Sequence, residues 1–115
     1  MLALATPAAA EPHQVIGYAG LLGEWELTAT VTEISSGSSG GFSGPLKMTH
    51  VGICTQAGPE EKIGEIVFHL SSSGLRATLT LAGVECTYEA RRSDAYKGQM
   101  TCPGRPALPL TLWVR

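Results

Sequence analysis

The chain has 115 residues, which is enough for one domain with a hydrophobic core and too few for two domains of ordinary size. Ten acidic and eight basic residues give a net charge of -2, so the chain has no basic field that would attract nucleic acid. Charged residues make up only 16% of the chain, a balance common in exported β-proteins. We expect a single domain that does not bind nucleic acid.

The first ten residues are read as the remnant of a secretory signal peptide. They form an apolar run that ends in Ala8-Ala9-Ala10, an A-x-A site with cleavage expected after Ala10. No Lys or Arg precedes this run, which leaves open whether Met1 is the true start, and the alternative is a frayed apolar terminus. No apolar run approaches the roughly 20 residues that span a bilayer. The expected location is periplasmic or secreted, with no transmembrane segment.

The first clear element is a strand within residues 21–33, where apolar and polar residues alternate with a period of two. One face carries Trp25, Leu27, Ala29 and Val31, and the other carries Glu and Thr. Residues 11–20 show no clear period and predict an irregular segment with a short helical turn. The Gly/Ser-rich residues 34–44 predict a flexible loop. Its one large apolar residue, Phe42, is either a lid over a cavity or an incidental packing contact.

The rest of the chain predicts further strands joined mostly by short connections. They cover residues 45–53, with a bulge near Thr49-His50, then 65–70, 75–81, 84–90, 96–102 and 108–114. Residues 11–115 therefore predict an all-β antiparallel meander of about seven to eight strands. A small closed or partly open barrel, lipocalin-like in form, would hide the sheet edges, and a two-layer sandwich is the alternative. The inward residues are mostly aliphatic, so the barrel is either filled or holds one modest apolar cavity.

The three cysteines predict one disulfide in an oxidising compartment, with one thiol left over. If the hairpin closes on residues 93–95, residues whose numbers sum to 188 stand opposite one another. Cys86 then lies across from Cys102, and Tyr88 across from Met100, at the separation that a disulfide needs. Cys54 is expected to stay reduced.

Gly23-Glu24-Trp25 resembles the G-x-W signature of the calycin families, which include lipocalins and avidins. In those families the Trp plugs one end of an antiparallel barrel and is covered by a basic residue from the last strand. The resemblance makes Arg115, or less favourably Arg105, the counterpart in this chain. It implies a small exported barrel that binds a hydrophobic molecule or a protein partner.

A second resemblance covers residues 23–31, 53–60 and 86–102. These segments are similar to the exported bacterial proteins of unknown function grouped as DUF3617. Such proteins have a W-E strand near the start, a C-x-T-P-E-like segment and two later cysteines across a hairpin. This sequence departs from the C-x-T-P-E-like segment because Ala57-Gly58 precedes Pro59. The resemblance implies export and carries no activity.

Catalytic and metal-binding patterns are sparse. The chain has a single Asp, at position 94, and no G-x-S-x-G pattern, which argues against a Ser-His-Asp triad. The pairs Glu24/Glu26 and Glu85/Glu89 lie on the polar parity of strands, where charge is ordinary. His50, Cys54 and His69 form the one candidate metal set; the alternative is two surface histidines and a small buried thiol. We expect no metal, no cofactor and no enzyme activity.

The sequence thus predicts a monomeric binding module for a small apolar molecule, held in or at the mouth of the barrel. The alternative is a protein-interaction or protease-inhibitor-like domain that acts through loops or a strand edge. The predicted ligand-binding residues are Trp25, Phe42, Phe68, Tyr88 and Met100.

Overall fold

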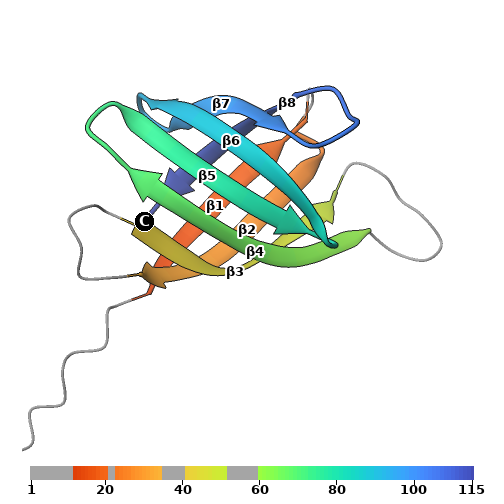
Figure 1. Cartoon of the computed structure of the whole chain (residues 1–115), viewed down its shortest axis with the longest axis horizontal. Helices are drawn as coiled ribbons and strands as arrows, with labels where there is room; N and C mark the ends of the chain where they lie inside the picture. The colour runs from red at the N-terminus through yellow and green to blue at the C-terminus, as the bar shows by residue number, and fades with distance from the viewer. Residues whose placement is uncertain (1–11, 21–22, 35–40, 52–59) are drawn as a thin grey trace, which may run out of the picture.

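The computed structural model describes residues 12–20, 23–34, 41–51 and 60–115. They form eight antiparallel strands in a closed meander barrel, with β1 beside β8 (Figure 1). The strands are β1 His13–Ala19, β2 Trp25–Glu33, β3 Gly41–His50, β4 Glu61–Leu70, β5 Gly74–Leu81, β6 Val84–Arg92, β7 Tyr96–Thr101 and β8 Leu108–Val114. The predicted all-β barrel is confirmed, and the described residues contain no helix. The predicted signal remnant, residues 1–10, lies outside them.

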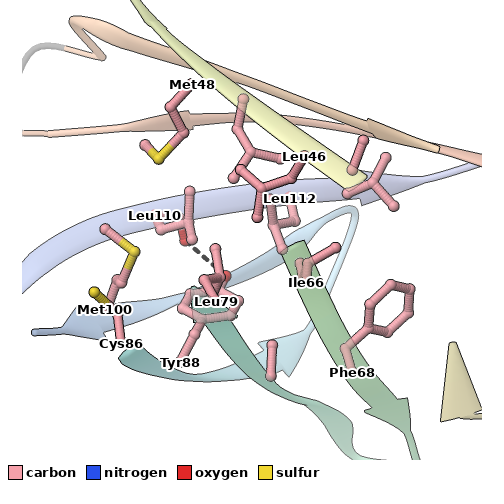
Figure 2. Close-up of a cluster of buried hydrophobic side chains, with 14 of the residues drawn as sticks. Leu46, Met48, Ile66, Phe68, Leu79, Cys86, Tyr88, Met100, Leu110 and Leu112 are labelled. Carbon is pink, nitrogen blue, oxygen red and sulfur yellow. Dashed lines mark hydrogen bonds between the residues drawn. The ribbon is translucent and has the colours of Figure 1, made fainter. Parts of the chain in front are cut away.

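The core is a single cluster inside the barrel. Alternate residues of each strand point inward, as the period of two predicts, so Leu27, Ala29 and Val31 of β2 are buried while Thr30 is exposed. No polar or charged residue among those described is fully buried. Figure 2 shows this cluster, in which the larger side chains are Leu46, Ile66, Phe68, Leu79, Tyr88, Leu110 and Leu112.

The helical turn predicted within residues 11–20 is wrong, because this segment forms β1. Its inward residues are Val15, Gly17 and Ala19, whereas the larger Ile16 and Tyr18 face outward. Gly17 has to be small, since a Cβ there would overlap the backbone carbonyl oxygen of Thr111 on β8 as well as the side chain of Leu112. Two of the inward residues are small and the outward residues Ile16 and Tyr18 are large, so the sequence does not show the usual alternation of apolar inward and polar outward residues.

The predicted loop over residues 34–44 is wrong at its carboxyl end. β3 begins at Gly41, so Phe42 is part of a strand and is buried; residues 35–40 lie outside the described part. The pairing of β2 with β3 keeps one register from Trp25 opposite His50 to Glu33 opposite Phe42. The bulge predicted near Thr49-His50 is therefore absent.

Two inward glycines, Gly44 and Gly64, let neighbouring strands approach closely. A Cβ on Gly44 would overlap the backbone carbonyl oxygen of Thr30, and a Cβ on Gly64 would overlap that of Thr80. Glycine at such sites removes the side chain that would hold the strands apart. These close approaches are consistent with a sheet that bends enough to close on itself.

The hairpin of β6 and β7 has the predicted register. Tyr88 lies opposite Met100, and Cys86 forms a disulfide with Cys102. Cys54, which was predicted to stay reduced, lies outside the described residues. The disulfide lies at the end of the barrel where β2, β4, β6 and β8 begin, at the right of Figure 1. We call this the cavity end, and the opposite end, which carries the carboxyl terminus, the aromatic end.

Candidate functional site

A cavity of about 220 Å³ opens at the cavity end of the barrel. The walls come from the first or last residues of β2 to β8 and from the two nearby turns, which explains why the sequence does not show them as one group. Most of them are apolar. The lining residues are Trp25, Met48, Lys62, Leu81, Ala82, Val84, Cys86, Met100, Cys102, Arg105, Pro106 and Leu108.

Trp25 forms one wall of the cavity, at the inward-facing start of β2. Its ring meets the ring of His50 on β3 at 4.5 Å between centroids and 63°. The Nζ atom of Lys62 on β4 lies 5.2 Å from the Trp25 ring centroid, within the range of a cation–π contact. The Trp25 ring thus contacts side chains of two other strands, β3 and β4, and a positive charge lies over it.

Sulfur-containing side chains from β3, β6 and β7 form much of the cavity lining. Met48, Met100 and the Cys86–Cys102 disulfide all line the cavity, and Figure 2 shows Met100 beside Cys86 at one side of the core. Thioether side chains are flexible and polarizable, so such a wall adapts to ligands of different shape. The disulfide ties β6 to the end of β7 at this rim.

The turn between β5 and β6 completes the rim. Ala82 and Gly83 both have positive φ, 50° and 81°, as a two-residue hairpin of type I′ requires. This tight turn places Ala82 and Val84 at the mouth of the cavity. Val84 has inward parity but is 45% exposed, because the barrel ends there.

Two of the five predicted ligand-binding residues line this cavity, namely Trp25 and Met100. Tyr88 is buried deeper in the barrel, where its hydroxyl donates to the carbonyl oxygen of Leu110 at 2.7 Å (Figure 2). The Tyr96 carbonyl oxygen lies 3.1 Å from the same hydroxyl. Burial raises the pKa of the Tyr88 hydroxyl well above its ordinary range. Tyr88 is thus bonded to the backbone of the barrel.

Phe42 and Phe68, the remaining two predicted residues, lie at the aromatic end. Their rings stack with centroids 5.3 Å apart, and the His13 ring meets Phe42 edge-on at 5.4 Å. These aromatic rings pack against one another at the end of the barrel remote from Trp25. The structure therefore divides the predicted set among the two ends of the barrel and its centre, where Tyr88 lies.

Arg115 also lies at the aromatic end. Its backbone N–H donates to the carbonyl oxygen of Gln14, and its own carbonyl oxygen lies 3.0 Å from Nδ1 of His13. The expectation that Arg115 covers Trp25 is therefore wrong, because the two residues are at opposite ends. Arg105 lines the cavity together with Trp25, and Lys62 is the residue over the Trp25 ring.

The candidate metal set is not brought together. His50 lies opposite Trp25 at the cavity end, whereas His69 lies opposite Gly41, nine positions away along β3. Nine strand residues span roughly 30 Å, far beyond the reach of one ion. Cys54 lies outside the described residues. Within the described ranges, no three His, Cys, Asp or Glu side chains are grouped as metal ligands.

A second and larger hollow, of about 1420 Å³, runs along β5, β6 and β7. It is a broad groove that includes the charged residues Arg76, Glu89, Arg91 and Lys97. Arg76 and Glu89 form an ion pair with both side chains largely exposed, the usual state of a solvated strand surface. The smaller cavity is enclosed by more apolar side chains and is the stronger candidate site.

Sequence reasoning named Arg105 only as the less favoured residue to cover Trp25. The lining residues that it missed are Met48, Lys62, Leu81, Ala82, Val84, Pro106 and Leu108. Lys62 lies between the predicted strands 45–53 and 65–70, yet β4 begins at Glu61, and Lys62 has the inward parity of Ile66 and Phe68. Gly64, between them, contributes no side chain and so interrupts the apolar pattern. Counting back by two from Phe68 through Ile66 and Gly64 puts Lys62 on the same inward face, and this is the signal that could have placed Lys62 at the mouth.

No family model, no curated protein and no solved structure matches this chain. A search of the described residues finds no helix long and apolar enough to cross a membrane.

Proposed function

We propose that this protein is an exported β-barrel that binds a small apolar molecule in the cavity at its Trp25 end. The observation that carries the proposal is the cavity of about 220 Å³, with an apolar and sulfur-rich wall, at an open end of a barrel whose centre is filled. Ligand sites are typically concave and mostly apolar, with few polar groups. This cavity has that composition.

The size of the cavity limits the ligand. Pockets for drug-sized molecules usually have volumes of about 300–1,000 Å³, so the space here suits a smaller molecule or only part of a larger one. A water molecule occupies about 30 Å³ in the liquid. The cavity therefore has room for roughly seven non-hydrogen atoms.

Export to a periplasmic or extracellular location is part of the proposal. It is supported by the Cys86–Cys102 disulfide, since disulfides persist in oxidising compartments. The signal-like residues 1–10 favour the same location.

The alternative, a protein-interaction or inhibitor domain, has less support in its strand-edge form. Each of the eight described strands pairs with a neighbour on both sides, so the barrel presents no free edge to a partner strand. The loop form of that alternative depends largely on residues 35–40, outside the described part.

Native mass spectrometry of protein purified from its own source tests the binding function. We expect a retained small molecule in the wild-type protein and its loss from Val84→Trp, because a large ring at the mouth fills the cavity. Val67→Trp is the matched control, since Val67 is 38% exposed, points outward on β4 and is not a lining residue. Equal retention by both variants would contradict the proposal, as would failure of the wild-type protein to take up any small apolar compound.

A further inference from the structure

We propose, on the basis of the binding function above, that the ligand is an anionic amphiphile. Its acid group is held by Lys62 and Arg105 at the mouth, and a short hydrocarbon part lies among Met48, Leu81 and Met100. The inference rests on the charges of the lining, on the position of Lys62 and on the change in burial from the mouth inward.

The charges of the cavity lining are one-sided. Its described residues include two cations, Lys62 and Arg105, and no carboxylate. The two ion pairs Lys47–Glu61 and Arg76–Glu89, both between described residues, do not involve a lining residue. A cavity with an excess of positive charge favours a ligand that brings a negative one.

The position of Lys62 directs its charge toward the cavity. Lys62 has the inward parity of β4 and is the direct cross-strand partner of Met48, a wall residue of β3. Its ammonium lies over the Trp25 ring, which fixes the end of an otherwise flexible side chain. An ammonium that is already placed loses less conformational freedom when an anion binds.

The lining changes in polarity along the axis of the barrel. Arg105 is exposed at the rim, whereas Met48, Leu81 and Met100 are 3%, 7% and 4% exposed. A molecule with one charged end and one hydrocarbon end fits this change, with its charge in the wetter part and its apolar end in the drier part. Neither a neutral hydrocarbon nor a small inorganic anion would use both.

Octanoate is the probe that matches the site. Its carboxylate can face Lys62, and its seven-carbon tail has about the number of atoms that the cavity holds. Octanamide is nearly the same size and is neutral, so the pair isolates the charge. Binding of each is measured by isothermal titration calorimetry and by the fluorescence of Trp25 in a Trp113→Phe background, which leaves Trp25 as the one tryptophan.

We expect octanoate to bind about tenfold more tightly than octanamide, because a hydrogen bond with a charged partner is stronger than a neutral one. Lys62→Met keeps an unbranched side chain and removes the charge. It should weaken octanoate binding about tenfold and change octanamide binding less than about twofold. Lys47→Met is the matched control: Lys47 pairs with Glu61 and is not a lining residue. It should leave both affinities unchanged.

The outcomes separate this inference from the binding function. Equal affinity for octanoate and octanamide, or a loss of both in Lys62→Met with the near-UV circular dichroism intact, would overturn the role of the charge and leave the apolar cavity in place. No binding of either compound to the wild-type protein would overturn the proposed function and this inference together. Weaker octanoate binding by Lys47→Met, equal to that by Lys62→Met, would show that only the overall charge matters.

Discussion

Both ends of the barrel contain inward-facing aromatic residues, but these residues are packed differently at the two ends. At the aromatic end, Phe42 and Phe68 stack at 5.3 Å with His13 edge-on to Phe42, and Phe68 is fully buried. At the cavity end, Trp25 has the same inward parity but is only partly buried. It packs against His50 and lies under the ammonium of Lys62.

The two ends differ in how completely they are packed, and under the proposed function this difference separates stability from ligand binding. Two stacked rings fill space and bring no charge, so the aromatic end resembles the dense interior of an ordinary core. A tryptophan beside a cation leaves about 220 Å³ open and keeps a charged group at the mouth. We therefore expect substitutions at the aromatic end to change mainly the free energy of unfolding, and those at the cavity end to change mainly ligand binding.

The sharpest test of this difference is the pair Phe68→Ala and Trp25→Ala. Phe68→Ala removes a fully buried ring and should lower the free energy of unfolding by about 3–5 kcal/mol. Trp25→Ala removes a larger but partly exposed ring beside an existing cavity, so the expected loss is only about 1–2 kcal/mol. Urea denaturation measures both. If Trp25→Ala is as destabilising as Phe68→Ala, the cavity end is a packed core like the other, and the distinction fails.

The disulfide provides the next largest effect, and it acts at the cavity end. The two cysteines are 16 positions apart. In the chain-entropy model such a loop contributes about 3 kcal/mol, and less where a hairpin already holds its ends together. The Cys86→Ala/Cys102→Ala double variant should therefore lose about 2–3 kcal/mol and still fold, because the core of the barrel does not depend on the bridge. Thermal and urea unfolding of both proteins check this.

Peptide mapping of protein from native cells, without reduction, tests the same bridge and the export proposal together. We expect a Cys86–Cys102 peptide, a reduced Cys54 and an amino terminus at or near Glu11. Recovery of Cys54 bridged to either partner would contradict the hairpin register. A retained Met1 with all three thiols free would contradict export.

Much of the barrel could be predicted because inward parity is a local property. The alternation of Leu27, Ala29 and Val31 identifies β2 by itself, and the hairpin of β6 and β7 follows from one turn and a register sum. β1 was missed because its inward positions include Gly17 and Ala19, which are small, while Tyr18 faces outward. The pairing of β1 with β8 that closes the barrel requires a small residue at Gly17. A pattern based on hydrophobicity does not identify such small residues as part of the core.

The site was harder to predict than the fold, because it is assembled from the ends of seven strands. Whether an inward aromatic residue lines the cavity depends on which end of its strand carries it. Phe42 and Trp25 both point inward, yet pairing places Phe42 beside Glu33, at the end of β2 opposite to Trp25. Lys62 and Arg105 join the site only through closure of the barrel, which brings β4 and the β7–β8 connection to the same mouth.

Tyr88 lies between the two ends and gives the smallest expected effect, which depends on pH. Tyr88→Phe removes a buried hydrogen bond to the Leu110 carbonyl and should lower the free energy of unfolding by about 1–2 kcal/mol at neutral pH. Tyr18→Phe, which removes a hydroxyl from a 43% exposed ring on the outer surface, is the control, with an expected change below about 0.5 kcal/mol.

The dependence of the free energy of unfolding on pH, at alkaline pH, tests whether the Tyr88 hydroxyl is buried. Burial raises the pKa of Tyr88 in the folded protein, whereas in the unfolded chain a tyrosine loses its proton near pH 10. Above about pH 10 the unfolded state therefore binds fewer protons than the folded state, and the free energy of unfolding falls as the pH rises. Below that pH this group contributes no slope. Urea unfolding between pH 8 and 11.5 should show a steeper alkaline fall in the wild-type protein than in Tyr88→Phe. Parallel curves would mean that the Tyr88 hydroxyl reaches water in the folded barrel, so that the filled centre separating the two ends is more open than its packing indicates.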